Sequence, residues 1–193
     1  CNFKYTNGGL FMKITTKELI VSTLFVALIT IGTFIRIPIG NDYFTLQFLF
    51  TLLAGLVLGA NLGGTAVLVY VFLGLAGVPV FASGGGFGYI LQPTFGYLIG
   101  FIIQAWFCGK FSRKLSNISC KSLVAVNFGG LLIVYTIGIS WFYIFSNYVV
   151  NAPISVWATL FYCGILQILP DFALCVGAAT LGYTCYRRGL WLS

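Results

Sequence analysis

The chain has 193 residues, of which 60% are hydrophobic and 7% charged, and its mean hydropathy is +1.02. A soluble domain carries about 25% charged residues, so this composition excludes a globular domain surrounded by water. The formal net charge is +7 and the chain contains no histidine. Because histidine is the commonest metal ligand and the commonest general base, its absence argues against a metal site and a His-based enzyme.

The distribution of the charges predicts an all-α integral membrane protein. No charged residue occurs between Asp42 and Lys110, and none occurs between Lys121 and Asp171. Stretches of this length fit several apolar spans of about 20 residues joined by short uncharged turns. Backbone groups in lipid must bond internally, and strict period-2 alternation is missing, so the spans are expected to be helices and not barrel strands.

We predict six transmembrane helices in one membrane domain, residues 12–193. Met12 and Lys13 look like a natural start, which makes residues 1–11 an extension without functional weight. Residues 154–168 are apolar but bounded by two prolines, so they form either part of one long kinked helix or a separate interfacial or re-entrant helix. We favour the second alternative, because proline suits the start of a helix better than its interior. The expected spans are residues 19–35, 44–60, 64–76, 93–109, 123–145 and 170–186.

Basic residues fix the expected orientation. With six spans, the three basic clusters fall on one side, which the positive-inside rule makes cytoplasmic. Both termini are therefore expected in the cytoplasm, and residues 36–42, 77–92 and 147–169 on the outer face. The same rule explains the positive charge without nucleic acid as a partner. The clusters contain Lys13 and Lys17, then Lys110, Arg113, Lys114 and Lys121, and finally Arg187 and Arg188.

Polar and small residues along the first four spans suggest contact sites. Thr23 and Ala27 form a small-residue step on the first span, which suits either a partner helix or internal packing. Gln47 and Gln92 lie near the outer ends of the second and fourth spans. Their amides offer both donors and acceptors to a polar ring such as a urea, although they could also cap helices or meet water.

Residues 77–89 are rich in glycine and aromatic side chains. Glycines at 84, 86 and 88 permit backbone conformations closed to other residues, and Phe81, Phe87 and Tyr89 offer apolar contact area. A loop of this kind at the outer ends of helices is expected to cover a ligand, with an ordinary tight connection as the alternative.

Asp171 is the candidate site residue with the strongest physical argument. An acid at the bilayer centre costs about 2.5–3.5 kcal/mol on insertion scales, so it usually faces a cavity or pairs with a partner. At the first turn of an outward-starting helix it would also gain from the helix dipole. The alternative is a helix cap exposed to water. The lack of a second acid inside the spans excludes an aspartyl dyad, so we expect no enzyme.

The sequence resembles the BioY family of biotin-specific S components of energy-coupling-factor (ECF) transporters. The resemblance extends from residue 12 to residue 188. Its most specific parts are Gly77-Val-Pro-Val-Phe-Ala-Ser-Gly-Gly-Gly and Gln92-Pro-Thr-Phe-Gly-Tyr-Leu-Ile-Gly-Phe101. Thr45-Leu46-Gln47 and Leu169-Pro170-Asp171 match further family segments.

The resemblance implies a bacterial cell-membrane subunit that captures biotin in an outward-facing cavity. Its implied partners are a transmembrane T subunit and two cytoplasmic ATPases, with no cofactor of its own. The implied binding residues are Gly96, Tyr97 and Asp171, with Phe81 in the covering loop. Gln47 and Gln92 are our additions. Thr23 and Ala27 are the nearest match to the family's contact for the T subunit.

One departure from the family concerns the neighbourhood of Asp171. The family usually has a lysine three residues later, where this chain has Leu174. Asp171 must then find other donors, among them the N–H groups of the ligand. The alternatives are an S component for another vitamin, such as thiamine or riboflavin, and a small membrane channel. A channel would need rings of polar residues, which only an oligomer could assemble from this sequence.

Overall fold

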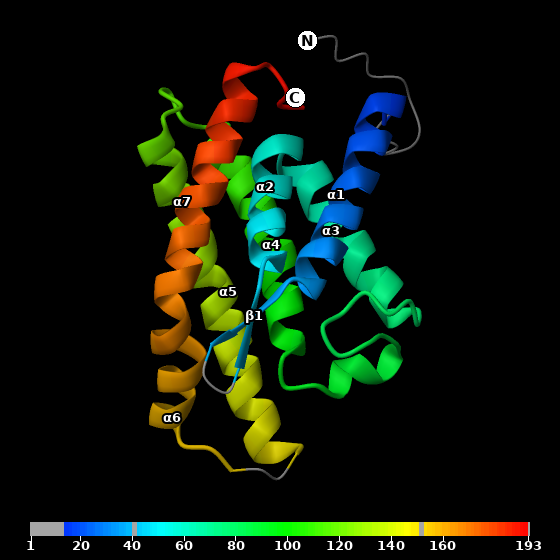
Figure 1. The fold of residues 1–193 in the computed structure, drawn as a ribbon, viewed down its shortest axis with the longest axis vertical. Coiled ribbons are helices and arrows are strands. Elements are labelled where there is room, and N and C mark those ends of the chain that lie inside the picture. The colour runs from blue at the N-terminus through cyan, green and yellow to red at the C-terminus, as the bar shows by residue number, and fades with distance from the viewer. Residues whose placement is uncertain (1–13, 40–41, 151–152, 193) are drawn as a thin grey trace, which may run out of the picture.

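The computed structural model describes residues 14–39, 42–150 and 153–192, and it describes their side chains except at residues 36–39 and 42–44. The described chain is a bundle of six helical segments (Figure 1). This confirms the predicted helical class. The proposed extension, residues 1–11, lies outside the described residues. The segments are α1 (Thr16–Phe34), α2 (Gln47–Leu58), α3 (Ala60–Leu75), α4 (Phe95–Ser112), α5 (Cys120–Tyr148) and a last helix made of α6 (Val156–Leu160), η2 (Phe161–Ile165) and α7 (Leu166–Arg187).

Two helices, α1 and α5, begin three residues before the predicted apolar runs, and each of them begins with a polar cap. At α1, the Thr15 hydroxyl accepts from the Glu18 amide at 3.3 Å, and the Glu18 carboxylate accepts from the Thr15 amide at 2.7 Å. Ser119 and Ser122 form the same reciprocal pair at the start of α5. Such capping boxes satisfy amides that have no partner within the helix, so the helices extend into polar sequence that hydropathy alone misses.

The helices differ in length. Three segments are long and apolar enough to cross a membrane, namely α1, α5 and the last helix over Val156–Arg187, whereas α2 and α3 are shorter apolar helices. With 12 residues, α2 rises about 18 Å at 1.5 Å per residue. A hydrocarbon core is about 30 Å thick, so α2 covers little more than half of that depth.

A β-hairpin precedes α2 and was not predicted from the sequence. Strand β1 (Arg36–Ile39) pairs antiparallel with β2 (Asp42–Thr45), with Arg36 opposite Thr45 and Ile39 opposite Asp42. Isoleucine, tyrosine and phenylalanine favour strands, and the Gly-Asn pair in the sequence between the strands is a known hairpin signal. The hairpin lies across the front of the bundle, below the start of α2 (Figure 1).

The last helix corrects our prediction for residues 154–186. The chain runs as a helix from Val156 to Arg187 with Pro170 inside it, so the long-helix alternative is right and the separate interfacial helix is wrong. The segment η2, which lies between α6 and α7, is a π-helix. Its wider turn adjusts the backbone ahead of Pro170 and so accommodates the proline ring within the helix. Asp171 consequently lies in the middle of a helix, and the expected stabilisation by a helix N-terminus does not apply.

Glycines let α4 pack closely against its neighbours. A Cβ atom at Gly55 of α2 would collide with the Ala105 carbonyl of α4, and one at Gly100 of α4 would lie 3.0 Å from the Cα of Val134 in α5. Gly59 has a different role, because its φ of 88° ends α2 and turns the chain into α3. A positive φ of this kind is readily available only to glycine.

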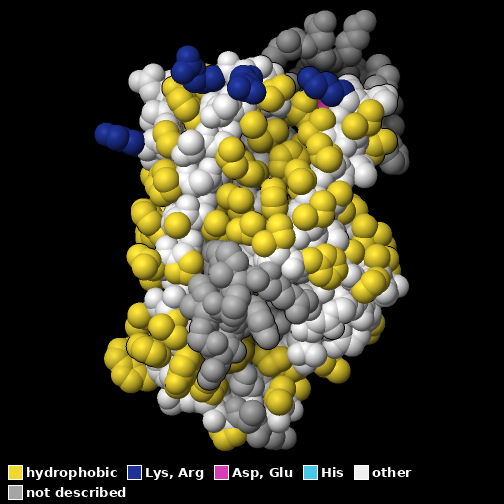
Figure 2. Space-filling view, viewed as in Figure 1, with side chains coloured by type: hydrophobic (Ala, Val, Ile, Leu, Met, Phe, Trp, Pro, Cys, Tyr) yellow, Lys and Arg dark blue, Asp and Glu magenta, His cyan; other side chains and the backbone are white. Residues whose placement is uncertain are grey.

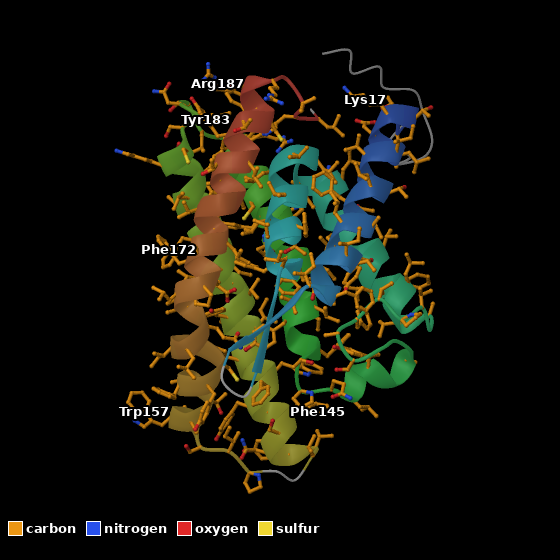
Figure 3. All side chains as sticks on the ribbon, viewed as in Figure 1. Lys17, Phe145, Trp157, Phe172, Tyr183 and Arg187 are labelled. Atoms are coloured by element: carbon orange, nitrogen blue, oxygen red, sulfur yellow. The ribbon has the colours of Figure 1, made fainter. Side chains whose placement is uncertain are left out.

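The basic side chains that the structure describes gather at one end of the bundle. Figure 3 shows Lys17 at the start of α1 and Arg187 at the end of α7 on the same end, and Figure 2 shows the blue side chains concentrated there above an apolar surface. Arg113, after α4, donates to the Leu56 and Val57 carbonyls at 3.1 Å each. These two carbonyls belong to the last turn of α2, where a cation is favoured.

The close packing at Gly55 leads to a stability prediction. Gly55→Ala should destabilise the fold by about 1–3 kcal/mol, because the added methyl group meets backbone and not a flexible side chain. Thermal unfolding in detergent measures the effect as a lower midpoint. Gly177→Ala on α7 is the matched control, since its Cβ would meet only Leu49 at 3.8 Å. Equal midpoints for the two variants would contradict the packing argument.

Candidate functional site

A cavity of about 300 Å³ lies in the half of the bundle away from the basic end. Its wall comes from the start of α2, the start of α4, the second half of α5 and the first half of the last helix, together with the hairpin and residues 76–94, which we call the lid loop. The lid loop contains the short 3₁₀ helix η1 (Phe87–Leu91). Ligand pockets in proteins begin at about this size. Because α2 is short, it does not extend through this half of the bundle. The hairpin and the lid loop lie at the opening that remains.

Asp171 lines the cavity and accepts a short hydrogen bond from Tyr135. The distance from the Tyr135 hydroxyl to Oδ2 is 2.6 Å, and the Asp171 side chain is only 8% exposed. Such short bonds are typical of a hydroxyl donating to an ionised carboxylate. A carboxylate can accept about four hydrogen bonds, so Asp171 keeps acceptor capacity toward the cavity.

The helices around Asp171 supply no cation. The sequence has no lysine or arginine between Arg36 and Lys110, or between Lys121 and Arg187, and these two stretches include the whole helical wall of the cavity. A carboxylate without a basic partner in apolar surroundings needs hydrogen-bond donors. Tyr135 provides one within the chain, which leaves room for a ligand to provide others.

The rest of the wall separates into polar and apolar parts. Asp171, Gln167 and Cys163 follow one another at intervals of four residues on the last helix, so they form one stripe facing the cavity. Aromatic and aliphatic side chains of α2, α4 and α5 form the apolar part of the wall. This arrangement suits a small molecule with a polar head and an apolar body. The apolar lining includes Phe48, Leu98, Phe101, Leu131, Val134 and Phe142.

Two further predicted residues lie in the wall. Gln47 is the first residue of α2 and is buried, and its Nε2 atom donates to the Tyr70 hydroxyl at 3.3 Å. Tyr97, in the first turn of α4, lines the cavity, and its ring rests on Gly138 of α5, where a Cβ atom would collide with it. The structure thus brings Gln47, Tyr97 and Asp171 to one cavity.

Three predicted residues do not line the cavity. Gly96 faces Trp141 of α5, and its missing side chain allows α4 and α5 to approach. Gln92 is exposed, and its backbone carbonyl accepts from the Trp141 indole at 3.4 Å. Phe81 belongs to the lid loop, and its side chain is buried with its ring centroid 4.4 Å from that of Tyr89. Its neighbours Ala82 and Ser83 reach the wall instead.

The small-residue step on α1 is accessible. Thr23 and Ala27 are both exposed, and the Thr23 hydroxyl bonds back to the Leu19 carbonyl at 2.9 Å. Large apolar side chains are exposed along the same helix, at Ile20, Leu24 and Ile31. Neither Thr23 nor Ala27 lines the cavity, so the two residues belong to a separate surface.

Sequence reasoning missed several wall residues. Tyr135 is the most important, and its signal was a hydroxyl inside the apolar run of the fifth span. Gln167 was missed because the interfacial-helix interpretation separated it from Asp171, one turn away. Ser83 lies in the predicted covering segment, but the sequence did not distinguish it from its neighbours.

Comparison with known proteins gives a consistent result. The model of the BioY family matches residues 7–189. A protein of Lysinibacillus sphaericus described as a probable biotin transporter BioY is 38% identical over 174 residues, covering 90% of this chain and 88% of the relative. The biotin transporter BioY of Thermotoga maritima is 41% identical over 124 residues, covering 64% and 72% of the two chains.

A solved structure has the same fold. It is a crystal structure of the S-component for biotin from an ECF-type ABC transporter, with a TM-score of 0.78 and 25% sequence identity. The match covers 93% of this chain and 95% of the other. The agreement extends over the whole bundle and not only over the apolar helices.

Proposed function

The chain belongs to the BioY family, and from that premise we propose that it is the biotin-binding S component of an ECF-type importer. It is a membrane protein and not an enzyme. The observation that carries the proposal is the carboxylate of Asp171 in a cavity of about 300 Å³ without a cation in the helical wall. The ureido ring of biotin has two N–H donors that such an acceptor can bind.

The wall has places for both parts of biotin. The ureido group would meet Asp171 and the amide of Gln47, and the thiophane ring and aliphatic chain would contact Tyr97 and the apolar side chains of α4 and α5. Burial of this apolar surface adds affinity at about 25 cal/mol per Å². Ala82, Ser83 and Tyr89 cover the ligand from the lid loop.

A role as an importer subunit also implies an orientation in the membrane and a set of partner subunits. The basic end faces the cytoplasm by the positive-inside rule, so both termini are cytoplasmic and the cavity opens outward from a bacterial cell membrane. A transmembrane T subunit and two cytoplasmic ATPases drive uptake. Thr23 and Ala27 offer an exposed small-residue contact for the T subunit, since small residues let helices approach closely.

Isothermal titration of the detergent-purified chain tests the function directly. We expect one-to-one binding of biotin and no binding of thiamine or riboflavin, because the relatives are described as biotin transporters and the cavity combines a carboxylate acceptor with an apolar wall. Binding of thiamine or riboflavin in place of biotin would retain the S-component architecture and contradict the substrate. A chain that binds none of the three would contradict the function.

Asp171→Asn should weaken biotin binding at least tenfold, about 1.4 kcal/mol. The amide keeps the shape but loses the charge that strengthens each accepted hydrogen bond. Glu18→Gln is the matched acid-to-amide control, because Glu18 lies in the helix cap at the basic end. If the Asp171 variant folds and binds biotin as tightly as the control, Asp171 does not contact the ligand.

Tyr135→Phe should weaken biotin binding about three- to tenfold, because the carboxylate loses the donor that orients it while the ring remains in place. The binding constant is measured by the same titration. Tyr143→Phe on the same helix is the control, since Tyr143 does not line the cavity. Equal affinities for the two variants would mean that the bond from Tyr135 does not orient Asp171.

A further inference from the structure

The hydroxyl group of Tyr70 joins three separate parts of the structure. Tyr70 belongs to α3 and is fully buried, with 0% exposure. Its hydroxyl donates to the Val80 carbonyl of the lid loop at 3.0 Å, accepts from Nε2 of Gln47 at 3.3 Å, and lies 3.0 Å from the Thr33 hydroxyl of α1. One oxygen atom therefore connects the lid loop, a wall residue of the cavity and α1.

The lid loop is anchored on α3 at this point. The Phe81 ring meets Tyr70 edge-on at 5.6 Å between centroids and occupies the space left by Gly74, and the Gly86 amide donates to the Gly74 carbonyl at 2.7 Å. Figure 1 shows the loop leaving the end of α3 and returning beside it. Ala82, between the anchors at Phe81 and Gly86, lines the cavity.

The available protons allow two arrangements at this junction. Each hydroxyl has one proton. When Tyr70 donates to Val80, Thr33 can donate to Tyr70. When the loop leaves, Tyr70 can donate to Thr33 while Thr33 donates to the Ile29 carbonyl, 2.9 Å away. Only the first arrangement satisfies the Val80 carbonyl, so it belongs to the closed loop.

We infer that Tyr70 is a positioning residue whose hydroxyl holds the lid loop closed and places the Gln47 amide in the cavity at the same time. The inference rests on the proposed function for the identity of the ligand. Closing the loop and orienting Gln47 then become one event, because both groups bond to the same oxygen. Tyr70 itself does not line the cavity.

Dissociation kinetics test this role. In Tyr70→Phe the ring packing remains, but the Val80 carbonyl is left without its donor, so the closed loop is destabilised and biotin should dissociate about tenfold faster. The rate is measured by chasing labelled biotin with an excess of unlabelled biotin. The association rate should stay within about twofold, since loss of a closed-state contact acts mainly on dissociation.

Two further variants separate positioning from general stability. Thr33→Val removes the neighbouring hydroxyl but retains the bond from Tyr70 to Val80, so dissociation should be no faster than in the unaltered chain. Tyr183→Phe, near the basic end (Figure 3), is the matched tyrosine control. An unchanged dissociation rate in Tyr70→Phe would overturn the inference, as would equal acceleration in Thr33→Val and Tyr70→Phe.

Hydrogen–deuterium exchange of the ligand-free chain gives a readout that does not require biotin. The amides of Phe81, Gly84 and Gly86, which bond within the loop or to α3, should exchange faster in Tyr70→Phe and not in Thr33→Val. Unchanged exchange in Tyr70→Phe would overturn the inference. Failure of biotin to bind the unaltered chain would contradict the proposed function, whereas faster exchange would still support the anchor.

Discussion

A carboxylate held inside an apolar helix bundle is the constraint on which the site depends. Asp171 lies in the middle of the last helix, where neither a helix N-terminus nor a cation of the surrounding helices stabilises its charge. The short bond from Tyr135 offsets part of the desolvation cost and orients the carboxylate. Its remaining acceptor capacity faces a cavity, and our proposal is that the N–H groups of a ligand fill it.

The cavity exists because the helices differ in length. Gly55 and Gly100 bring α4 close to α2 and α5, and this packing closes the bundle toward the basic end. At the other end α2 begins only at Gln47, and a hairpin and the lid loop take the place of further helix turns. Irregular backbone at membrane depth is tolerated where it lines a cavity or is buried in protein. Thr45 at the end of the hairpin and Ala82, Ser83 and Tyr89 of the lid loop line this cavity.

Most of the helical architecture could be predicted from apolar runs, because hydropathy and the basic clusters constrain spans strongly. The hairpin was missed because its four-residue strands adjoin apolar helices and disappear in a hydropathy window. The break expected at Pro170 was wrong because a π-turn before the proline lets the helix continue. That error also hid Gln167, whose place beside Asp171 follows only from a continuous helix.

The candidate site was predictable only in part. A lone acid in apolar sequence has few explanations, so Asp171 could be singled out without a structure. Tyr135 could not, since it reaches Asp171 from 36 residues away through packing of α5 against the last helix. Gly96 illustrates the opposite case, because a glycine in a family motif can serve helix packing and not the ligand.

The most direct test of the account is a double-mutant cycle between Asp171 and the ureido N–H groups of biotin. It compares biotin with analogues methylated at either ureido nitrogen, each titrated into the unaltered chain and into Asp171→Asn. The account predicts that methylation at one nitrogen weakens binding to the unaltered chain at least tenfold, about 1.4 kcal/mol, and has a much smaller effect on the variant. Equal losses in both proteins, for both analogues, would contradict a bond between Asp171 and the ligand.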